Sequence, residues 1–164
     1  MDPEHLGYLI DRHSPAMVLF ARQWCSTPED VVQEAFIKLV RQKPAPLSPV
    51  AWLYRTVRNG AISQLRSERR RHTHEARAAE RVPFWFQPPE DPGGIDAATA
   101  AKALADLPID QREAIVAHLW GGLTFDQIAE MAGSSAATVW RRYSAGLAAL
   151  RQRLRILCPK APSP

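Results

Sequence analysis

The stretch TFDQIAEMAGSSAATVWRR, residues 124–142, decides the fold. A helix-turn-helix needs a small residue where its two helices cross, a glycine at the turn four residues later, and a branched apolar residue six positions beyond the glycine. Ala129, Gly133 and Val139 stand at this spacing. We therefore predict two helices that meet at Gly133.

The second helix of this motif carries candidate DNA contacts. In a helix-turn-helix the start of that helix enters the major groove, where arginine can reach guanine edges or phosphates. An ordinary helical hairpin can show a similar short pattern, so this window alone leaves that alternative open. The candidate contact residues are Ser135, Ala137, Thr138, Trp140, Arg141 and Arg142.

Helical periodicity extends on both sides of the motif, and no strand pattern is found along the chain. Apolar residues recur at intervals of three and four, and the segments between them contain helix caps, prolines or glycines. The C-terminal part is expected to form a helix over 97–107, a helix that Asp110 can cap, a helix opened by a capping box at Thr124 and Gln127, and a last helix capped by Ser134 or Ser135 that runs to about Leu154.

The N-terminal part shows the same periodicity. Thr27 is expected to cap a helix that has Pro28 at its first position, with Asp30 returning a bond to the cap. A proline-rich loop over 43–49 follows, because three prolines in seven residues end a helix. The expected elements are a helix or a broken pair from about Leu6 to Cys25 with the break near Ser14-Pro15, the helix after Thr27, and a helix from Val50 to about Ala79.

A break between two halves is expected at residues 82–96, which contain four prolines, a Gly-Gly pair and three acidic residues. The aromatic run Phe84-Trp85-Phe86 inside it is expected to dock on one half or on a partner. The predicted fold is all-α, with two small, separately folded helical domains. The expected organisation is a first domain at 1–81, a linker at 82–96, a second domain at 97–157 and a tail at 158–164.

Positive charge is concentrated in two segments. Residues 1–51 carry five basic and six acidic side chains, whereas residues 52–81 carry eight arginines and three glutamates. From Ser135 to the end there are six basic residues and no acidic one. Two separate basic segments favour two contacts with a polyanion such as DNA, although each alone could be a solvated helix face.

Other classes of function have weak support. Cys25 and Cys158 lie far apart and belong to no cysteine cluster, so neither a disulfide framework nor a zinc site is expected. His72 and His74 have no third ligand near them in the sequence. No phosphate loop or catalytic constellation is evident, and no targeting segment is seen at the N-terminus. We expect a cytoplasmic protein that is not an enzyme, binds no metal or other cofactor, and does not associate with a membrane.

Three motifs, in order along the chain, resemble the extracytoplasmic-function (ECF) subfamily of bacterial sigma-70-type sigma factors. Residues 28–36, PEDVVQEAF, are similar to the family's polymerase-binding segment. Residues 51–59, AWLYRTVRN, and the Leu-Arg pair at 65–66 resemble the segment that melts and reads the downstream, minus-ten promoter element. The Leu-Pro pair at 107–108 and the helix-turn-helix resemble the region that reads the upstream, minus-thirty-five element.

The resemblance implies a transcription initiation factor that binds core RNA polymerase, at the clamp helices and flap of its large subunits, and promoter DNA. An anti-sigma factor is a further candidate partner. The polymerase-binding candidates are Asp30, Gln33, Glu34 and Phe36. The candidates for the minus-ten element are Trp52, Tyr54, Arg55, Arg58, Asn59, Arg66, Arg69 and Arg70.

Two features differ from the family's pattern. Trp140 occupies a position that is often basic, and the loop over 43–49 is unusually rich in proline, so the preferred bases are not predicted. For Trp52, core packing is an alternative to base contact. Two other functions stay open: a helix-turn-helix regulator that acts without sigma activity, and a nucleic-acid-modifying enzyme, for which no catalytic constellation is seen.

Overall fold

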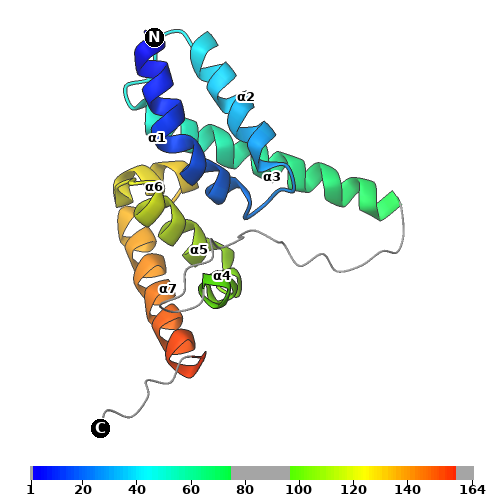
Figure 1. Ribbon diagram of the computed structural model, residues 1–164, viewed down its shortest axis with the longest axis vertical. Helices are drawn as coiled ribbons and strands as arrows, with labels where there is room; N and C mark the ends of the chain where they lie inside the picture. Colours follow the sequence, from blue (N-terminus) through cyan, green and yellow to red (C-terminus); the bar gives the residue numbers. More distant parts are fainter. Residues whose placement is uncertain (1, 75–96, 158–164) are drawn as a thin grey trace.

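A computed structural model describes residues 2–74 and 97–157 of the chain (Figure 1). Within these ranges every regular element is helical and no strand occurs, so the predicted all-α class is confirmed. The elements are α1 (Pro3–Ala21), α2 (Pro28–Arg41), α3 (Pro49–His74), α4 (Ala97–Ala105), α5 (Ile109–Ile115), the π-helix η1 (Val116–Trp120), α6 (Phe125–Ala132) and α7 (Ala136–Leu157).

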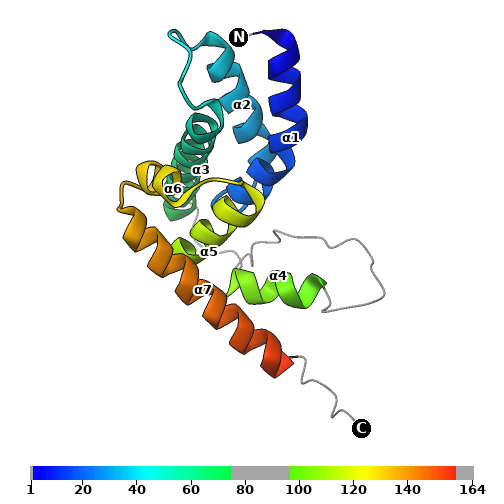
Figure 2. The ribbon, with the colours of Figure 1, turned by 90° about the vertical axis from the view of Figure 1, so that its left-hand side faces the viewer.

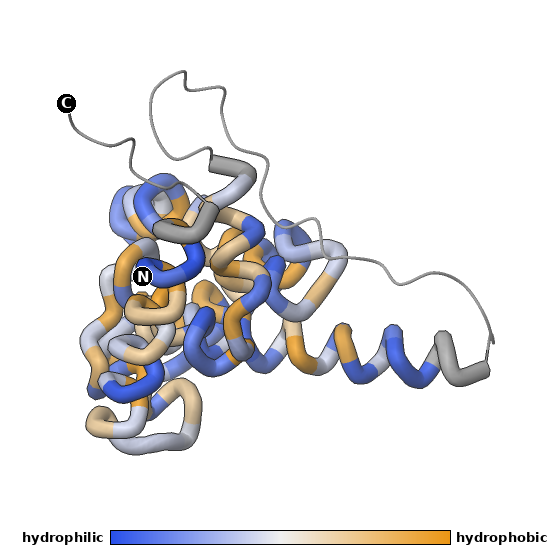
Figure 3. Tube along the Cα trace, turned by 90° about the horizontal axis from the view of Figure 1, so that it is seen from below, coloured by the Kyte–Doolittle hydropathy of each residue, from blue (hydrophilic) through white to orange (hydrophobic). Residues whose placement is uncertain are grey.

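Helices α1, α2 and α3 pack against one another and form what we call the N-terminal bundle (Figure 1). Each contributes an apolar stripe, because residues three and four apart share one face of a helix. The C-terminal part of α3 projects from the rest of the molecule and alternates in hydropathy along its length (Figure 3). The buried side chains of this bundle include Leu9, Met17, Phe20, Val32, Ala35, Leu39, Leu53 and Val57.

Helices α4 to α7 form the C-terminal bundle, in which the long helix α7 packs along α4, α5 and α6 (Figure 2). The predicted helix-turn-helix is confirmed as α6 and α7. Gly133 ends α6 with a φ of 63°, a left-handed conformation that glycine adopts without steric cost. Ala129 and Val139 are buried where the two helices meet, with relative exposures of 5% and 1%.

The two bundles are in contact with each other. Helix α3 contacts α6, α1 contacts η1, and the buried apolar residues of both bundles form one continuous cluster. Both predicted helical bundles are therefore present, and in this structure they pack against each other. Gly121 shows how close the contact is, because a Cβ atom built on it would come within 2.9 Å of Tyr54 Cζ. Local periodicity does not reveal such a contact, because it joins residues far apart in the sequence.

Two local predictions in the N-terminal bundle, a break near Pro15 and a cap at Thr27, differ from the structure in detail. Helix α1 is continuous through Pro15, so no break occurs at Ser14-Pro15. Leu9 and Phe20 are buried on either side of the proline, and this packing supports the helix despite the missing backbone donor. Thr27 holds the N-cap position of α2 as predicted but makes no capping bond. Its hydroxyl instead accepts a hydrogen bond from Gln64 Nε2 at 3.1 Å.

Caps in the C-terminal bundle differ in the same way. The capping box of α6 is present, with Gln127 N donating to Thr124 Oγ1 at 3.3 Å and Thr124 N donating to Gln127 Oε1 at 2.9 Å. Ser135 Oγ accepts from Thr138 N at 3.2 Å at the start of α7. Asp110 does not cap α5, which begins one residue earlier, at Ile109.

Some expectations concern residues outside the ranges that the structure describes. The whole of the proposed linker, including Phe84-Trp85-Phe86, lies outside the described residues, and so does Cys158. The side chains of His72 and His74 are also outside the description. In the described part, no group of three or more potential metal ligands comes together. Over the same part, no helix combines the length and apolarity that crossing a bilayer would require.

Candidate nucleic-acid interface

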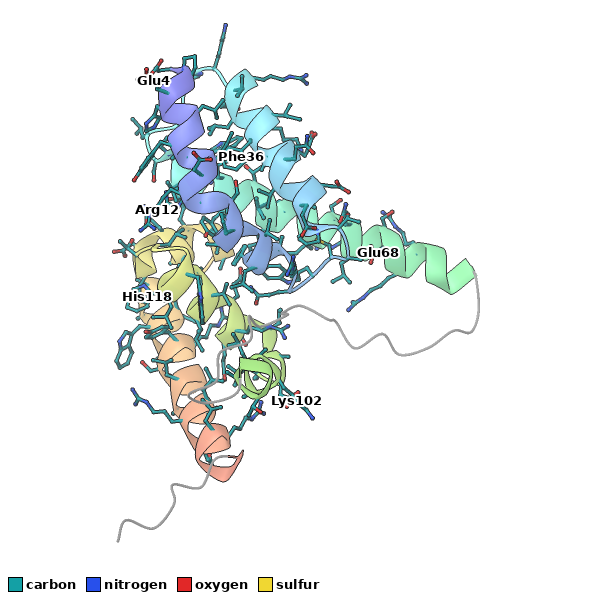
Figure 4. All side chains as sticks on the ribbon, viewed as in Figure 1. Glu4, Arg12, Phe36, Glu68, Lys102 and His118 are labelled. Atoms are coloured by element: carbon teal, nitrogen blue, oxygen red, sulfur yellow. The ribbon has the colours of Figure 1, made fainter. Side chains whose placement is uncertain are left out.

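Helix α2 exposes a polar stripe on the side opposite its buried one. Asp30, Gln33 and Glu34 all lie on the surface, and Glu34 forms an ion pair with Lys38 at 3.5 Å. Phe36, expected to bind polymerase with them, is 7% exposed and lies between α1 and α2 (Figure 4). That assignment is wrong for Phe36, because its ring belongs to the hydrophobic core. Asp30, Gln33 and Glu34 therefore remain as the exposed candidates for polymerase binding on α2.

The expected minus-ten contacts on α3 fall into two groups. Asn59, Arg66, Arg69 and Arg70 are exposed, and Arg66 to Arg70 belong to the projecting part of α3 around Glu68 (Figure 4). Trp52 is half-buried and packs against the core. Its side chain contributes to packing and also keeps part of its surface exposed, so its contact with a base stays a prediction.

Tyr54 is the clear error in this set. Its side chain is completely buried, and its ring lies edge-on to that of Phe20 at a centroid distance of 5.2 Å. Burial raises the pKa of its phenol far above the ordinary value, and its hydroxyl has no hydrogen-bond partner. Tyr54 is therefore a core residue at the contact between the bundles, and it cannot touch DNA in this conformation.

Two arginines of α3 form ion pairs with the C-terminal bundle. Arg58 donates both Nε and Nη2 to the carboxylate of Glu113, with Nη2 3.4 Å from Oε2. Arg55 Nη1 lies 3.3 Å from Glu130 Oε1. Arg58 and Glu113 are 23% and 7% exposed, so their pair is much better shielded from water than the second pair, whose side chains are 47% and 72% exposed.

The loop before α3 also reaches the C-terminal bundle. Gln127 Nε2 donates to Ser48 Oγ at 3.3 Å. Together with the two ion pairs, this bond covers the face of α3 on which part of the minus-ten contact was expected. Arg55 and Arg58 could bind DNA phosphates in place of these carboxylates, because both groups accept the same hydrogen bonds from arginine.

The start of α7 is accessible. Ser135, Ala137 and Arg141 are exposed, and Trp140 retains 56% of its accessible surface. A short chain of hydrogen bonds orients the arginine: Arg141 Nη2 donates to Thr138 Oγ1 at 3.1 Å, and that oxygen lies 3.0 Å from Ser135 Oγ. These residues form a polar edge with one large aromatic ring, suited to a groove of DNA.

Arg142 does not share this orientation. Its Nε lies 3.0 Å from Asp110 Oδ2, so the side chain turns back toward α5. The expected contact of Arg142 with DNA is therefore not supported by its position.

Three residues at the contact between the bundles were not predicted: Glu113, Glu130 and Gly121. One signal was present for Glu113: an acidic residue beside the apolar run of α5 is expected to have a partner if it is buried. Glu130 and Gly121 gave no comparable signal.

The rings of His118, Phe125 and Tyr143 form an aromatic cluster that joins η1, α6 and α7. The His118 ring stacks on Phe125 at 4.4 Å and lies edge-on to Tyr143 at 5.0 Å. His118 Nδ1 lies 2.8 Å from the carbonyl oxygen of Leu123, so the ring joins η1 to the loop before α6. These contacts fix α6 relative to α7 and make the motif a rigid platform.

Family models match both bundles. The model of Sigma-70 region 2 matches residues 9–71, and that of Sigma-70, region 4 matches residues 99–150. They correspond to the N-terminal and the C-terminal bundle, in that order. Together they span well over half of the chain.

Three curated relatives are named as RNA polymerase sigma factors. The ECF RNA polymerase sigma factor SigL of Mycobacterium tuberculosis is 29% identical over 157 residues, which cover 91% of this chain and 88% of SigL. SigK of Mycolicibacterium vanbaalenii, also an ECF sigma factor, is 28% identical over 79% of this chain and 68% of its own length. The probable RNA polymerase sigma factor RfaY of Xanthomonas campestris is 29% identical over 85% of this chain, which spans only 37% of RfaY.

A solved structure shares the arrangement of the helices. The sigma factor RpoE of Bartonella quintana, crystallised in complex with the anti-sigma factor NepR, matches with a TM-score of 0.74 and 27% identity over 94% of this chain and 99% of RpoE. Because both sigma-70 regions are present in order on two helical bundles, and ECF sigma factors match most of its length, the chain belongs to the extracytoplasmic-function family of sigma-70-type sigma factors.

Proposed function

We propose that the chain binds core RNA polymerase with α2, engages the minus-ten element with α3 and reads the minus-thirty-five element with α7. One observation carries this proposal: a helix-turn-helix with an accessible recognition face shares a chain with a second helical bundle that matches sigma-70 region 2. A regulator could use an N-terminal bundle for dimerisation or sensing, but it would not need that bundle to match sigma-70 region 2.

The polymerase contact is assigned to Asp30, Gln33 and Glu34. Two carboxylates and an amide on one exposed stripe present acceptors to basic residues of a partner, here the clamp helices of core polymerase. The flap of the large subunits is assigned to the C-terminal bundle. An anti-sigma factor is a third candidate partner, because the related RpoE was crystallised with one.

The minus-ten contact is assigned to the cations and the amide of α3: Arg55, Arg58, Asn59, Arg66, Arg69 and Arg70. Single-stranded DNA is held by cations along its backbone and by hydrogen bonds to its base edges. Asn59 can form such bonds to a base, and the arginines can bind phosphates. Phe36 and Tyr54 are left out because both are core residues.

The minus-thirty-five contact is assigned to Ser135, Ala137, Thr138, Trp140 and Arg141. Arg141 can bind a guanine edge or a phosphate, and the exposed indole of Trp140 can pack against a thymine methyl group. On this proposal residues 1–81 form the unit that binds polymerase and the minus-ten element, and residues 97–157 form the unit that reads the minus-thirty-five element. On this proposal the chain acts in the cytoplasm, where polymerase and promoter are found. The polymerase, and not this chain, catalyses the formation of phosphodiester bonds in the transcript.

Reconstituted transcription tests the proposal. Adding the chain to core polymerase should give promoter-specific transcripts, and substituting Asp30→Ala, Gln33→Ala and Glu34→Ala together should abolish them. A matched control is Glu4→Ala with Asp11→Ala, which removes the same charge from exposed positions of α1 and should leave transcription intact. Tight DNA binding by the chain alone, with no transcripts from the chain plus core polymerase, would contradict the proposal and favour a regulator without sigma activity.

A further inference from the structure

The accessible face at the start of α7 carries small residues and one large aromatic ring. Trp140 keeps 56% of its surface exposed, and Ala137, three positions before it, is exposed as well. Residues three apart are neighbours on a helix, so Ala137 and Trp140 form one apolar patch, which we call the apolar pair. Ala145 and Ala148, further along the helix, are also exposed and leave room for close approach to a partner.

The polar groups around the apolar pair already bond to one another. Thr138 Oγ1 lies 3.0 Å from Ser135 Oγ and accepts a hydrogen bond from Arg141 Nη2 at 3.1 Å, while Arg142 is paired with Asp110. In the described part of the chain, by contrast, the indole of Trp140 has no hydrogen bond and no ring contact. A partner can therefore pack against Trp140 without displacing any existing bond.

The chemistry of the major groove selects one base for such a patch. Thymine presents a methyl group there, whereas adenine, guanine and cytosine present only hydrogen-bond donors and acceptors. Removing a methyl group from water against an indole or an alanine side chain strengthens binding, by about fourfold for each methyl that is buried. The surrounding charge fits DNA as the partner, because from Ser135 to the end there are six basic residues and no acidic one.

Resting on the upstream contact proposed above, we propose that Trp140, together with Ala137, sets the base preference of α7 by packing against thymine methyl groups. The upstream element of this chain's promoters then contains thymines that are read by apolar contact rather than by hydrogen bonds. Arg141 contributes the neighbouring charged contact, to a phosphate or a guanine, and holds the helix in the groove while the apolar pair selects the bases.

The test removes the methyl groups from the DNA. Duplexes are first selected from a randomised library with the chain bound to core polymerase, which identifies the upstream element. Each thymine of that element is then replaced by deoxyuridine, which forms the same base pair without the methyl group, and binding is measured by fluorescence anisotropy. We expect the wild-type chain to bind the deoxyuridine duplex about fourfold more weakly for each methyl contacted. Trp140→Ala should lose most of this difference.

Two further variants serve as controls. Trp120→Ala removes a tryptophan that is 50% exposed in the same bundle but lies on η1 rather than on α7, so it should keep the wild-type ratio between the two duplexes. Trp140→Phe keeps an apolar ring and removes the indole N–H donor, and it should also keep most of the ratio. Because Trp140 is exposed, neither change at this position is expected to disturb the fold.

The same ratio for the wild-type chain and Trp140→Ala would overturn the proposal, as would an upstream element without thymine or a library from which no element is enriched. Weaker binding by Trp140→Phe with no dependence on the methyl groups would also overturn it, because the indole N–H would then make the contact. Failure of the chain to bind core polymerase would instead refute the function proposed above. The selection is in that case made with the chain alone, whose α7 is accessible at its start.

Discussion

The two helices proposed to read DNA differ in how accessible their arginines are. On α7, Arg141 is exposed and is oriented by a hydrogen bond within its own helix. On α3, Arg58 is largely covered and is paired with a buried carboxylate of the other bundle. Both helices have the positive charge that DNA binding requires. The difference teaches that location, rather than charge, decides which surface the free chain offers to a promoter.

The largest expected effect comes from removing core volume beneath α7. Ile128 is 1% exposed in the cluster that both bundles share, so Ile128→Ala should lower the free energy of unfolding by about 2–5 kcal/mol. Because the core is continuous, both bundles should lose stability in one transition during urea unfolding. Leu47→Ala, at a fully exposed position, is the control and should change little. Two separate transitions, with only one shifted, would contradict a shared core.

The next effect compares two neighbouring arginines of α7. Arg141→Ala should weaken binding to duplex promoter DNA by about 1–3 kcal/mol, because an exposed contact to a base or phosphate is lost. Arg142→Ala should have a clearly smaller effect, because Arg142 is bound to Asp110. Fluorescence anisotropy at several salt concentrations measures both. Equal losses for the two variants would show that Arg142 leaves Asp110 when DNA binds.

A smaller effect compares two helix caps, one in each bundle. Thr124 makes its capping bond and Thr27 does not. Thr124→Ala should therefore cost about 1 kcal/mol of stability, a typical value for a lost cap. Thr27→Ala should cost less, because it removes only an exposed bond to Gln64. Urea midpoints measure the difference, and a larger loss for Thr27→Ala would reverse this assignment.

The smallest effect, absent at neutral pH, concerns Cys25 in the N-terminal bundle. Burial raises the pKa of this thiol from 9.0 to about 11. The folded state therefore retains the proton more strongly than the unfolded state, so the contribution to stability is complete below pH 9 and is lost as the pH rises toward 11. In a Cys158→Ser background, wild-type stability should fall more steeply over this range than that of Cys25→Ala. Parallel curves, or rapid alkylation of Cys25 at pH 7, would contradict its burial.

Local features could be predicted from the sequence. The helix-turn-helix, its capping box and the turn at Gly133 depend on residues within about twenty positions of one another, so spacing was sufficient. The exposed stripe of Asp30, Gln33 and Glu34 followed from helical periodicity. Tyr54 and Phe36 were assigned to DNA and to polymerase by resemblance, but both are buried, because their helices turn these side chains into the core.

Contacts between distant residues could not be predicted. Arg58 and Glu113 are 55 positions apart, and nothing near either residue specifies the other. The same holds for Ser48 with Gln127 and for Tyr54 with Gly121. These contacts occupy Arg55 and Arg58 and leave Asn59, Arg66, Arg69 and Arg70 exposed. Composition and periodicity therefore located the helices proposed to bind DNA without showing which of their arginines are already paired.

Co-purification of the chain with core polymerase, followed by sequencing of the DNA enriched with the complex, tests most directly whether both helices read promoters. We predict fragments that share two conserved elements at a fixed spacing upstream of a transcription start. Enrichment of a single element, equally strong when polymerase is absent, would contradict this account.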